Sequence, residues 1–249
     1  MVKIETRIMS PTAINTYLSC PRKFYFRYIR KLRSRPSIYL TRGQIVHKTL
    51  RRFHETPLKV NSPDPLSQVK GALLGIFETE WRSQEKTLQS LEPSPERLEV
   101  FHDESQRMLV NYSNWFLREG KPAPSFSELK IFSSALGLMG IIDAVMIRDD
   151  KAILIDYKTS SRRSVSDETL RQAALYALLY EDRSGNAPEA VWIHFLIDPA
   201  DPEEIPIDEE LLEYGKMTLD SVRKKTLSND EKDYPCTCGG FCKRDFLEA

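Results

Sequence analysis

Apolar residues recur at helical spacing in the first half of the chain and form shorter runs in the second half. Helices are therefore predicted over residues 11–32, from about 43 onward, over 66–88 and over 95–118. Ser10 as N-cap and Pro11 at the first helical position mark the start of the first helix. The prolines between residues 55 and 65 predict a loop.

After residue 125 the pattern favours strands over 128–136, 138–147, 152–158 and 190–197. Helices are expected over 166–183 and 208–227. Helices before and after a three-strand meander predict a mixed α/β domain. A chain of 249 residues with 41% hydrophobic side chains can bury one sizeable core, so we expect a single domain.

The apolar runs are too short for a membrane protein, because none approaches 18 residues. The opening MVKIETRIMS also lacks the apolar core of a secretory signal. We therefore expect a cytoplasmic protein. No GxxxxGK[ST] motif occurs, so a helicase motor is not expected in this chain.

Charge is unevenly distributed although the formal net charge is zero. Twelve Lys or Arg and no Asp or Glu lie between Thr6 and His54. Charge of this kind suits phosphates and interleaved aromatic rings suit stacked bases, so a nucleic-acid-binding surface is predicted there. Its cations are Arg22, Lys23, Arg27 and Arg30, and its aromatic residues are Tyr17, Phe24, Tyr25, Phe26 and Tyr28. At helical spacing the same rings would equally suit a core, and Arg223–Lys225 offers another basic surface.

The four cysteines are concentrated at the two ends of the chain. Cys20 stands alone, whereas Cys236, Cys238 and Cys242 surround the flexible pair Gly239-Gly240. An intracellular setting disfavours disulfides, and four thiolates suffice for one iron–sulfur cluster or one zinc ion. Gaps of one and three residues match no common ligand spacing, so unrelated free thiols are the alternative.

The segment GLMGIIDAVMIRDDKAILIDYKTS predicts a hairpin that carries charged groups inside apolar strands. If the turn is centred on Asp149-Asp150, Asp143 lies opposite Asp156, and Lys158 shares their face. Two such carboxylates need a compensating cation, and oxygen ligands suit Mg²⁺ or Mn²⁺. A structural Asp–Lys–Asp ion network is the alternative, and a bulge would break the opposition.

Asp143 followed by Asp156-Tyr157-Lys158 resembles the paired acidic motifs of the PD-(D/E)XK nuclease superfamily, in particular its RecB-like branch. SPTAINTYLSCPRKFYFRY resembles the opening helix of that branch, GQIVHKTLRRF its histidine motif and RQAALYALLY its glutamine–tyrosine motif. The C-terminal cysteines resemble the cluster of the iron–sulfur members, which include CRISPR-associated exonucleases and the AddB nuclease domain, although the spacing there is two and five residues.

The resemblance implies a restriction-endonuclease-like core, a central mixed sheet flanked by helices, and a role for each matching residue. His47, Asp143, Asp156 and the Tyr157 carbonyl would bind the catalytic metal, and Lys158 would be the catalytic lysine. Gln172 and Tyr176 would contact the scissile strand or support Lys158, and Glu128 would be an accessory acid. Cys20, Cys236, Cys238 and Cys242 would hold a 4Fe–4S cluster, with zinc as the less favoured metal and Asp245 as a substitute ligand.

The implied organisation is a basic helical arch with the first cysteine (1–54), a helical insertion (55–124), a catalytic α/β core (125–227) and a cysteine tail (228–249) that joins the two termini. The expected function is metal-dependent hydrolysis of DNA, as an exonuclease on single-stranded ends. CRISPR spacer acquisition and recombinational repair are both open, with adaptation proteins or a helicase as partners. A non-cutting DNA-binding or scaffold subunit and a zinc-containing RNA-binding module are the alternatives.

Overall fold

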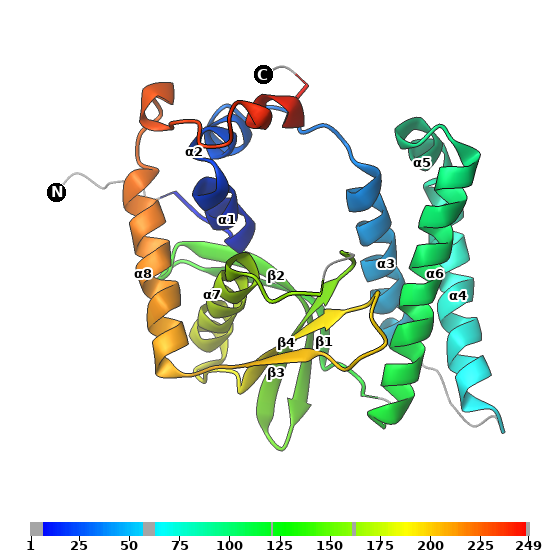
Figure 1. Cartoon of the computed structure of the whole chain (residues 1–249). Coiled ribbons are helices and arrows are strands. Elements are labelled where there is room, and N and C mark those ends of the chain that lie inside the picture. The colour runs from blue at the N-terminus through cyan, green and yellow to red at the C-terminus, as the bar shows by residue number, and fades with distance from the viewer. Residues whose placement is uncertain (1–6, 57–62, 121, 161–162, 248–249) are drawn as a thin grey trace.

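The computed structural model describes residues 7–56, 63–120, 122–160 and 163–247, so most of the proline-containing loop predicted over 55–65 lies outside the described residues. The first half of the chain is helical (Figure 1). Its elements are α1 (Pro11–Ser19), α2 (Pro21–Phe24), a π-helical turn (Tyr25–Ile29), α3 (Ile38–Glu55), α4 (Pro65–Ser83), α5 (Glu85–Leu91) and α6 (Pro95–Arg118).

The second half contains the sheet and two further long helices. Its elements are β1 (Phe126–Ser133), β2 (Leu138–Arg148), β3 (Lys151–Lys158), α7 (Asp167–Ser184), β4 (Ala190–Phe195), β5 (Glu203–Pro206) and α8 (Glu209–Lys225), followed by two short 3₁₀ turns (Glu231–Asp233 and Phe241–Asp245). The strands form one sheet in the order β1-β2-β3-β4-β5. Only β3 and β4 are parallel, and α7 makes the crossover between them. The predicted mixed sheet flanked by helices is confirmed, while the short strand β5 was not predicted.

Helices cover both faces of this sheet (Figure 1). On one face α1, α7 and α8 bury an apolar cluster that also includes Tyr234 and Phe246 of the C-terminal tail. On the other face α3, α4 and α6 bury a second cluster. Alternation along β3 divides its side chains between the two: Ile153, Ile155 and Tyr157 join the second cluster, whereas Leu154 joins the first.

The single helix expected over 11–32 is divided at Cys20. Cys20 has extended backbone (φ −160°, ψ 111°) between α1 and α2 because the following Pro21 disfavours a helical conformation in the residue before it. The chain therefore turns at this cysteine, and its thiol faces the C-terminal tail. The helix expected over 66–88 is likewise divided, at Gln84, into α4 and α5.

The predicted β2–β3 hairpin register is confirmed. Arg148 pairs with Lys151, and Ala144 pairs with Ile155. Asp149 and Asp150 form the two-residue turn with φ values of 51° and 62°. This left-handed pair is the geometry that matches the twist of a tight hairpin, and Asp tolerates it better than most residues.

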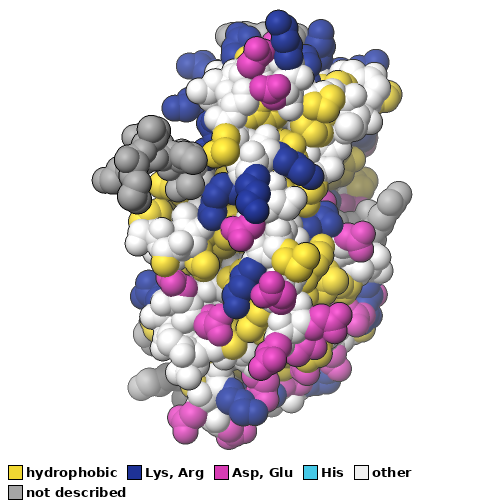
Figure 2. Space-filling model, turned by 90° about the vertical axis from the view of Figure 1, so that its left-hand side faces the viewer, with side chains coloured by type: hydrophobic (Ala, Val, Ile, Leu, Met, Phe, Trp, Pro, Cys, Tyr) yellow, Lys and Arg dark blue, Asp and Glu magenta, His cyan; other side chains and the backbone are white. Residues whose placement is uncertain are grey.

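Charge segregates along the surface seen from the α8 side. In Figure 2, Lys and Arg side chains gather toward the upper end of the molecule and Asp and Glu toward the lower end. Helix α8 has the same polarity, with Glu209 and Glu210 in its first turn and Arg223, Lys224 and Lys225 in its last. This arrangement complements the helix dipole. No helix in the described part of the chain combines the length and apolar character needed to cross a membrane.

His194 gives the fold a specific acid sensitivity. The ring is 1% exposed and packs against Tyr112, Trp115 and Tyr157. Burial lowers the pKa of His194 to about 4. The unfolded chain, with a His pKa near 6.5, therefore binds the proton more tightly, and stability present above pH 6.5 is lost as pH falls toward 4.

We predict that His194→Phe reduces the loss of unfolding free energy between pH 7 and 4.5 by roughly 2–3 kcal/mol, because phenylalanine fits the aromatic surroundings and does not titrate. Urea unfolding at both pH values measures the difference. An unchanged pH dependence in the variant would show that His194 does not titrate in this way.

Candidate active site and cysteine cluster

The two acidic positions of the hairpin lie where the β2–β3 ladder ends. The last paired residues are Ala144 and Ile155, one step before Asp143 and Asp156. Beyond that point Asp143 Oδ2 accepts a hydrogen bond of 2.9 Å from the Tyr157 backbone N–H. The expected register therefore holds as far as Ala144 and Ile155. The expected direct opposition of Asp143 and Asp156 on one face is wrong, because at this position the Asp143 side chain replaces the backbone pairing and turns toward His47.

Strand β2 slips by one residue at this same point. Ile142 and Val145, three residues apart, both pack in the cluster on the α7 face, whereas strict alternation has a period of two. On the neighbouring strand the register passes from Ser127 to Leu129, and Glu128 between them has φ 49°. This bulge-like irregularity directs Asp143 toward α3, where it meets His47.

Asp156 and Lys158 lie on the α7 side of β3. Lys158 Nζ is 2.6 Å from Asp156 Oδ2, a close ion pair without the directionality of a hydrogen bond. The same ammonium donates to Gln172 Oε1 at 2.9 Å, and Gln172 Nε2 donates to the Tyr176 hydroxyl at 3.0 Å. Gln172 and Tyr176 are one helical turn apart, so α7 presents both toward the end of β3, as their spacing predicts.

His47 reaches the site from α3. Its Nδ1 lies 3.1 Å from Asp143 Oδ1. Burial acts to lower the pKa of His47, but the Asp143 and Asp156 carboxylates outweigh it, and the pKa is raised. Arg42 holds α3 against the end of β3 by donating to the Thr159 carbonyl at 3.0 Å.

Close approach of α3 also depends on Gly43. A Cβ atom at this glycine would lie 3.0 Å from Thr159 Oγ1. A larger side chain here would therefore require the Thr159 hydroxyl to move or α3 to shift away from it. The position of His47, one turn further along α3, depends on this contact.

Burial dominates the electrostatics of the site. Asp156 is only 6% exposed, and loss of solvation raises its pKa despite the nearby Lys158 ammonium. The Asp143 carboxylate raises it further. Burial also raises the pKa of Tyr176, and the Asp156 charge adds to the shift. These neighbours act on one another, so the predicted residues form one electrostatic unit.

The residues present fit a divalent cation. Within the described residues, Asp156 Oδ2 is a buried oxygen with no hydrogen bond, and two carboxylates carry more negative charge than Lys158 alone compensates. Carboxylates, an imidazole and the Tyr157 carbonyl form a donor set suited to Mg²⁺ or Mn²⁺. This fit concerns the chemistry of the donors, and metal binding by these residues stays a prediction.

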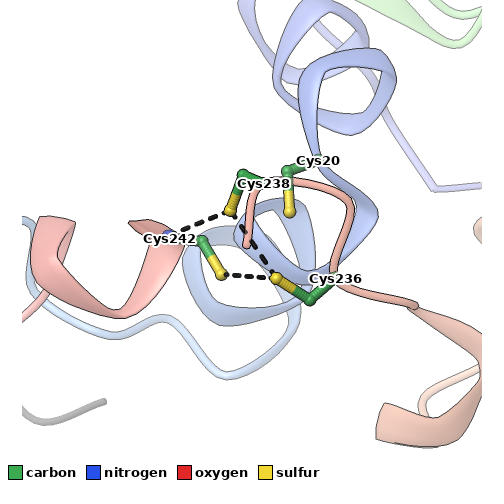
Figure 3. A group of neighbouring side chains, drawn as sticks. All are labelled: Cys20, Cys236, Cys238 and Cys242. Atoms are coloured by element: carbon green, nitrogen blue, oxygen red, sulfur yellow. Dashed lines mark hydrogen bonds between the residues drawn. The ribbon is translucent and has the colours of Figure 1, made fainter. Parts of the chain in front are cut away.

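The four cysteines come together from the two ends of the chain (Figure 3). Their sulfur atoms all lie within 4.8 Å of one another, and Cys236 Sγ is 3.6 Å from both Cys238 Sγ and Cys242 Sγ. The backbone N–H groups of Gly240 and Cys242 point at sulfur atoms, at 3.3 and 3.1 Å. Gly239 and Gly240 permit this turn with φ values of 63° and 87°.

This cysteine cluster fits a bound metal in number and in ligand type. Four thiolates are the usual ligand set of an iron–sulfur cluster. One tetrahedral metal with bonds of about 2.3 Å would hold its sulfur atoms about 3.8 Å apart, which also matches the closer contacts. Burial acts to raise the pKa of Cys20, but hydrogen bonds from Thr237 and Lys23 outweigh it and lower the pKa to about 6. The thiolate form that binds metals is thereby favoured.

The C-terminal tail is attached to the N-terminal segment by further contacts. Thr237 Oγ1 donates to the Ser19 carbonyl at 3.1 Å, and Arg22 Nε donates to the Tyr234 carbonyl at 2.7 Å. Arg22 also pairs with Glu231, and Lys23 pairs with Asp245 at 2.7 Å. Asp245, considered as a substitute ligand, is therefore paired with a lysine instead.

Most of the nucleic-acid-binding surface predicted near the N-terminus is used for packing within the protein. Tyr17, Phe24, Tyr25 and Phe26 are buried in the core, so they do not form a surface on which bases could stack. Arg22 and Lys23 are used in the contacts with the tail. Arg27 and Arg30 are exposed, and nucleic-acid binding by these two residues stays a prediction.

Sequence reasoning missed the residues that position α3. Arg51 pairs with Glu128 at 2.5 Å, so the expected accessory acid has a basic partner in this structure. Arg42 is buried and also pairs with Glu104 of α6. Arg51 lies four residues after His47, and this helical spacing could have predicted that both side chains share one face of the helix. Arg42 had no comparable signal, because its partners are distant in sequence.

Comparisons with known proteins identify the family of this chain. Residues 8–240 match the family described as the PD-(D/E)XK nuclease superfamily. The match spans most of the chain, so the protein belongs to this superfamily. The expected family and the expected enzyme class, a deoxyribonuclease, are thereby confirmed.

A solved structure shows the same fold at low sequence identity. A candidate exonuclease from Eubacterium rectale is 11% identical with a TM-score of 0.58, and the match covers 100% of this chain and 92% of that protein. A second structure, SSO0001, is 14% identical with a TM-score of 0.27 over 72% of this chain and 85% of its own, and it carries no weight here. No curated protein matches the chain significantly.

We predict that Cys20→Ser lowers both the metal content and the melting temperature. Cys20 and Cys236 are 216 residues apart, so a shared metal ties the two ends of the chain and adds its own binding free energy to folding. Iron, zinc and acid-labile sulfide analysis of anaerobically purified protein, together with a thermal melt, measures both effects.

Lys23→Ala is the matched control, since it removes a tail contact without removing a thiolate. An exposed ion pair is worth about 1 kcal/mol or less, so this variant should keep its metal and melt within a few degrees of the wild type. Full metal content and an unshifted melt in Cys20→Ser would show that Cys20 is not a ligand.

Proposed function

We propose that the protein is a metal-dependent exonuclease that hydrolyses phosphodiester bonds at single-stranded DNA ends. One observation carries the proposal: Asp143, Asp156 and Lys158, with His47 and Gln172 as neighbours, converge where the β2–β3 ladder ends. Family membership supports hydrolysis of DNA. The preference for ends and for unpaired strands comes from the resemblance to the RecB-like branch.

In the proposed mechanism His47, Asp143, Asp156 and the Tyr157 carbonyl hold Mg²⁺ or Mn²⁺. When bound, the cation would neutralise negative charge and make a water molecule more acidic. The Lys158 ammonium stabilises the negative charge that develops on the phosphoryl oxygens. Because Asp156 is nearly dry, this electrostatic stabilisation is stronger than it would be in water.

Gln172 and Tyr176 are positioning residues in this proposal. Gln172 accepts from Lys158 and donates to Tyr176, so the pair fixes the direction of the ammonium group. A lysine side chain has many rotamers, and holding one of them in advance reduces the entropic cost of reaching the transition state. Gln172→Ala should therefore lower kcat while leaving the fold intact.

The cysteine cluster has a structural role in the proposal. We expect it to hold a 4Fe–4S cluster, with zinc as the alternative, and to link the tail to α1 and α2. A cytoplasmic setting suits these thiolates, since disulfides are disfavoured there. CRISPR spacer acquisition and recombinational repair remain the two candidate pathways, with adaptation proteins or a helicase as partners.

A non-cutting DNA-binding or scaffold subunit is the competing function. Such a role does not require a buried carboxylate and a half-buried one beside a lysine, because their desolvation destabilises the fold. The burial of Asp156 thus favours catalysis over scaffolding. The RNA-binding alternative has no support from the family match.

We predict that Asp156→Ala abolishes cleavage and largely preserves DNA binding, because it removes a metal ligand and leaves the basic surface intact. Lys158→Ala should also abolish cleavage, with metal binding retained. Digestion of DNA labelled at its 5′ or 3′ end, with Mg²⁺, Mn²⁺ or chelator, measures activity, polarity and metal dependence together.

Lys151→Ala serves as the matched control. Lys151 begins the same strand, but its ammonium pairs with Glu189 at the exposed end of the hairpin. It should cut at the wild-type rate. Wild-type cleavage by both Asp156→Ala and Lys158→Ala would contradict the proposed site.

A further inference from the structure

Two hollows on the α3 side of the molecule are continuous with the candidate active site. The first, about 630 Å³, is lined by His47 and Asp143 and by Arg51, Lys130 and Ile141. The second, about 810 Å³, lies between α3 and α6 and reaches Arg97, Val100 and Phe101. Tyr39, Leu40 and Thr159 line both, so together they form one track leading away from the carboxylates.

The walls of this track are more apolar than a typical protein surface. Tyr39 and Leu40, at the junction of the two hollows, are 62% and 58% exposed. Val100 and Ile141, further along in either direction, are 56% and 47% exposed. Large apolar side chains exposed together along a concave surface indicate a binding site.

Tyr39 has the geometry of a stacking platform. The buried Phe101 ring stands perpendicular to it, at a centroid distance of 5.3 Å and an interplanar angle of 88°. The Arg42 guanidinium lies 5.8 Å from the Tyr39 centroid. These two contacts support the ring while leaving most of it exposed.

The charges of the track limit what its occupant can be. Lys48 pairs with Glu80, and Arg51 pairs with Glu128, so much of the positive charge is compensated within the protein. A track of this kind lacks the dense basic surface that a stiff duplex needs, since a duplex presents mainly its phosphates. An unpaired strand can instead turn its bases onto aromatic and aliphatic side chains.

We propose that this track binds an unpaired DNA strand and that Tyr39 stacks on a base close to the scissile phosphate. The inference rests on the proposed function, because the track begins at His47 and Asp143, two of the proposed metal ligands. It places the strand along α3 and α6 and not over Arg27 and Arg30 at the π-helical turn. The helices before the sheet thereby acquire a role in selecting single strands.

Fluorescence anisotropy tests the proposal with a labelled single-stranded oligonucleotide and with a blunt duplex of the same sequence, both in chelator. Tyr39→Ala should weaken single-strand binding roughly 5- to 150-fold, the range for losing one base–aromatic stack. Tyr39→Phe should retain the affinity, because it keeps the ring. Duplex binding should change little, and in metal Tyr39→Ala should raise KM more than it lowers kcat.

Phe132→Ala is the matched control, because Phe132 is 59% exposed on β1 and lines neither hollow. Its single-strand affinity should equal that of the wild type. Unchanged binding by Tyr39→Ala, equal losses on single strand and duplex, or failure of Tyr39→Phe to retain affinity would each overturn the proposal. If Arg27→Ala and Arg30→Ala lost single-strand affinity while Tyr39→Ala kept it, the strand would lie over Arg27 and Arg30 instead.

Binding in chelator separates this inference from the proposed function. If the wild type binds single strands through Tyr39 but does not cut them in any metal, the track stands and the nuclease mechanism fails. If the wild type cuts and Tyr39→Ala binds normally, the mechanism stands and the track fails. Thermal melts of every variant confirm that folding is unchanged.

Discussion

Two carboxylates at the point where the β2–β3 ladder ends impose the main constraint on this protein, because their charge is held near apolar packing. Asp156 is almost fully buried, and its charge is opposed by Lys158 within the same strand. Asp143 is held by a backbone N–H of the neighbouring strand and by His47 from α3. Strand β3 and helix α3 therefore supply hydrogen-bond donors and positive charge to these two groups, and the fold brings the two elements together.

The helices on the two faces of the sheet divide this task. From one face α7 supplies Gln172, which orients Lys158 through a hydrogen bond. From the other face α3 supplies His47, and its approach depends on Gly43 and on Arg42 at the Thr159 carbonyl. The site therefore lies between two independently packed layers. A change in either apolar core would move one half of the site relative to the other.

Much of this arrangement follows from local sequence patterns. The hairpin register could be predicted because the turn at Asp149-Asp150 and the flanking apolar runs specify it together. The slip at Asp143 could not, since it depends on Glu128 of the adjacent strand adopting a left-handed conformation. The helix break at Cys20 could have been predicted from Pro21, which follows it. The short strand β5 could not, because it forms by pairing with β4. Local sequence patterns thus predict the helices and strands, whereas long-range contacts decide where these elements depart from regular geometry.

The excess of positive charge near the N-terminus shows how long-range contacts change the meaning of a sequence pattern. In the chain this charge is separated from the acidic residues, which favours a surface for an external polyanion. In the fold much of it is met by acids from elsewhere: Arg22 by Glu231, Lys23 by Asp245, Arg42 by Glu104, Arg51 by Glu128, and Lys48 and Arg52 by Glu80. These partners come from the helical insertion, the sheet and the tail, so the basic segment serves to assemble the protein. The aromatic rings within this segment likewise pack in the core and help to assemble the protein. Exposed Tyr39 differs from them because it lies beyond the buried stripe of its helix, in the hollow that Asp143 also lines, rather than within the packed layers.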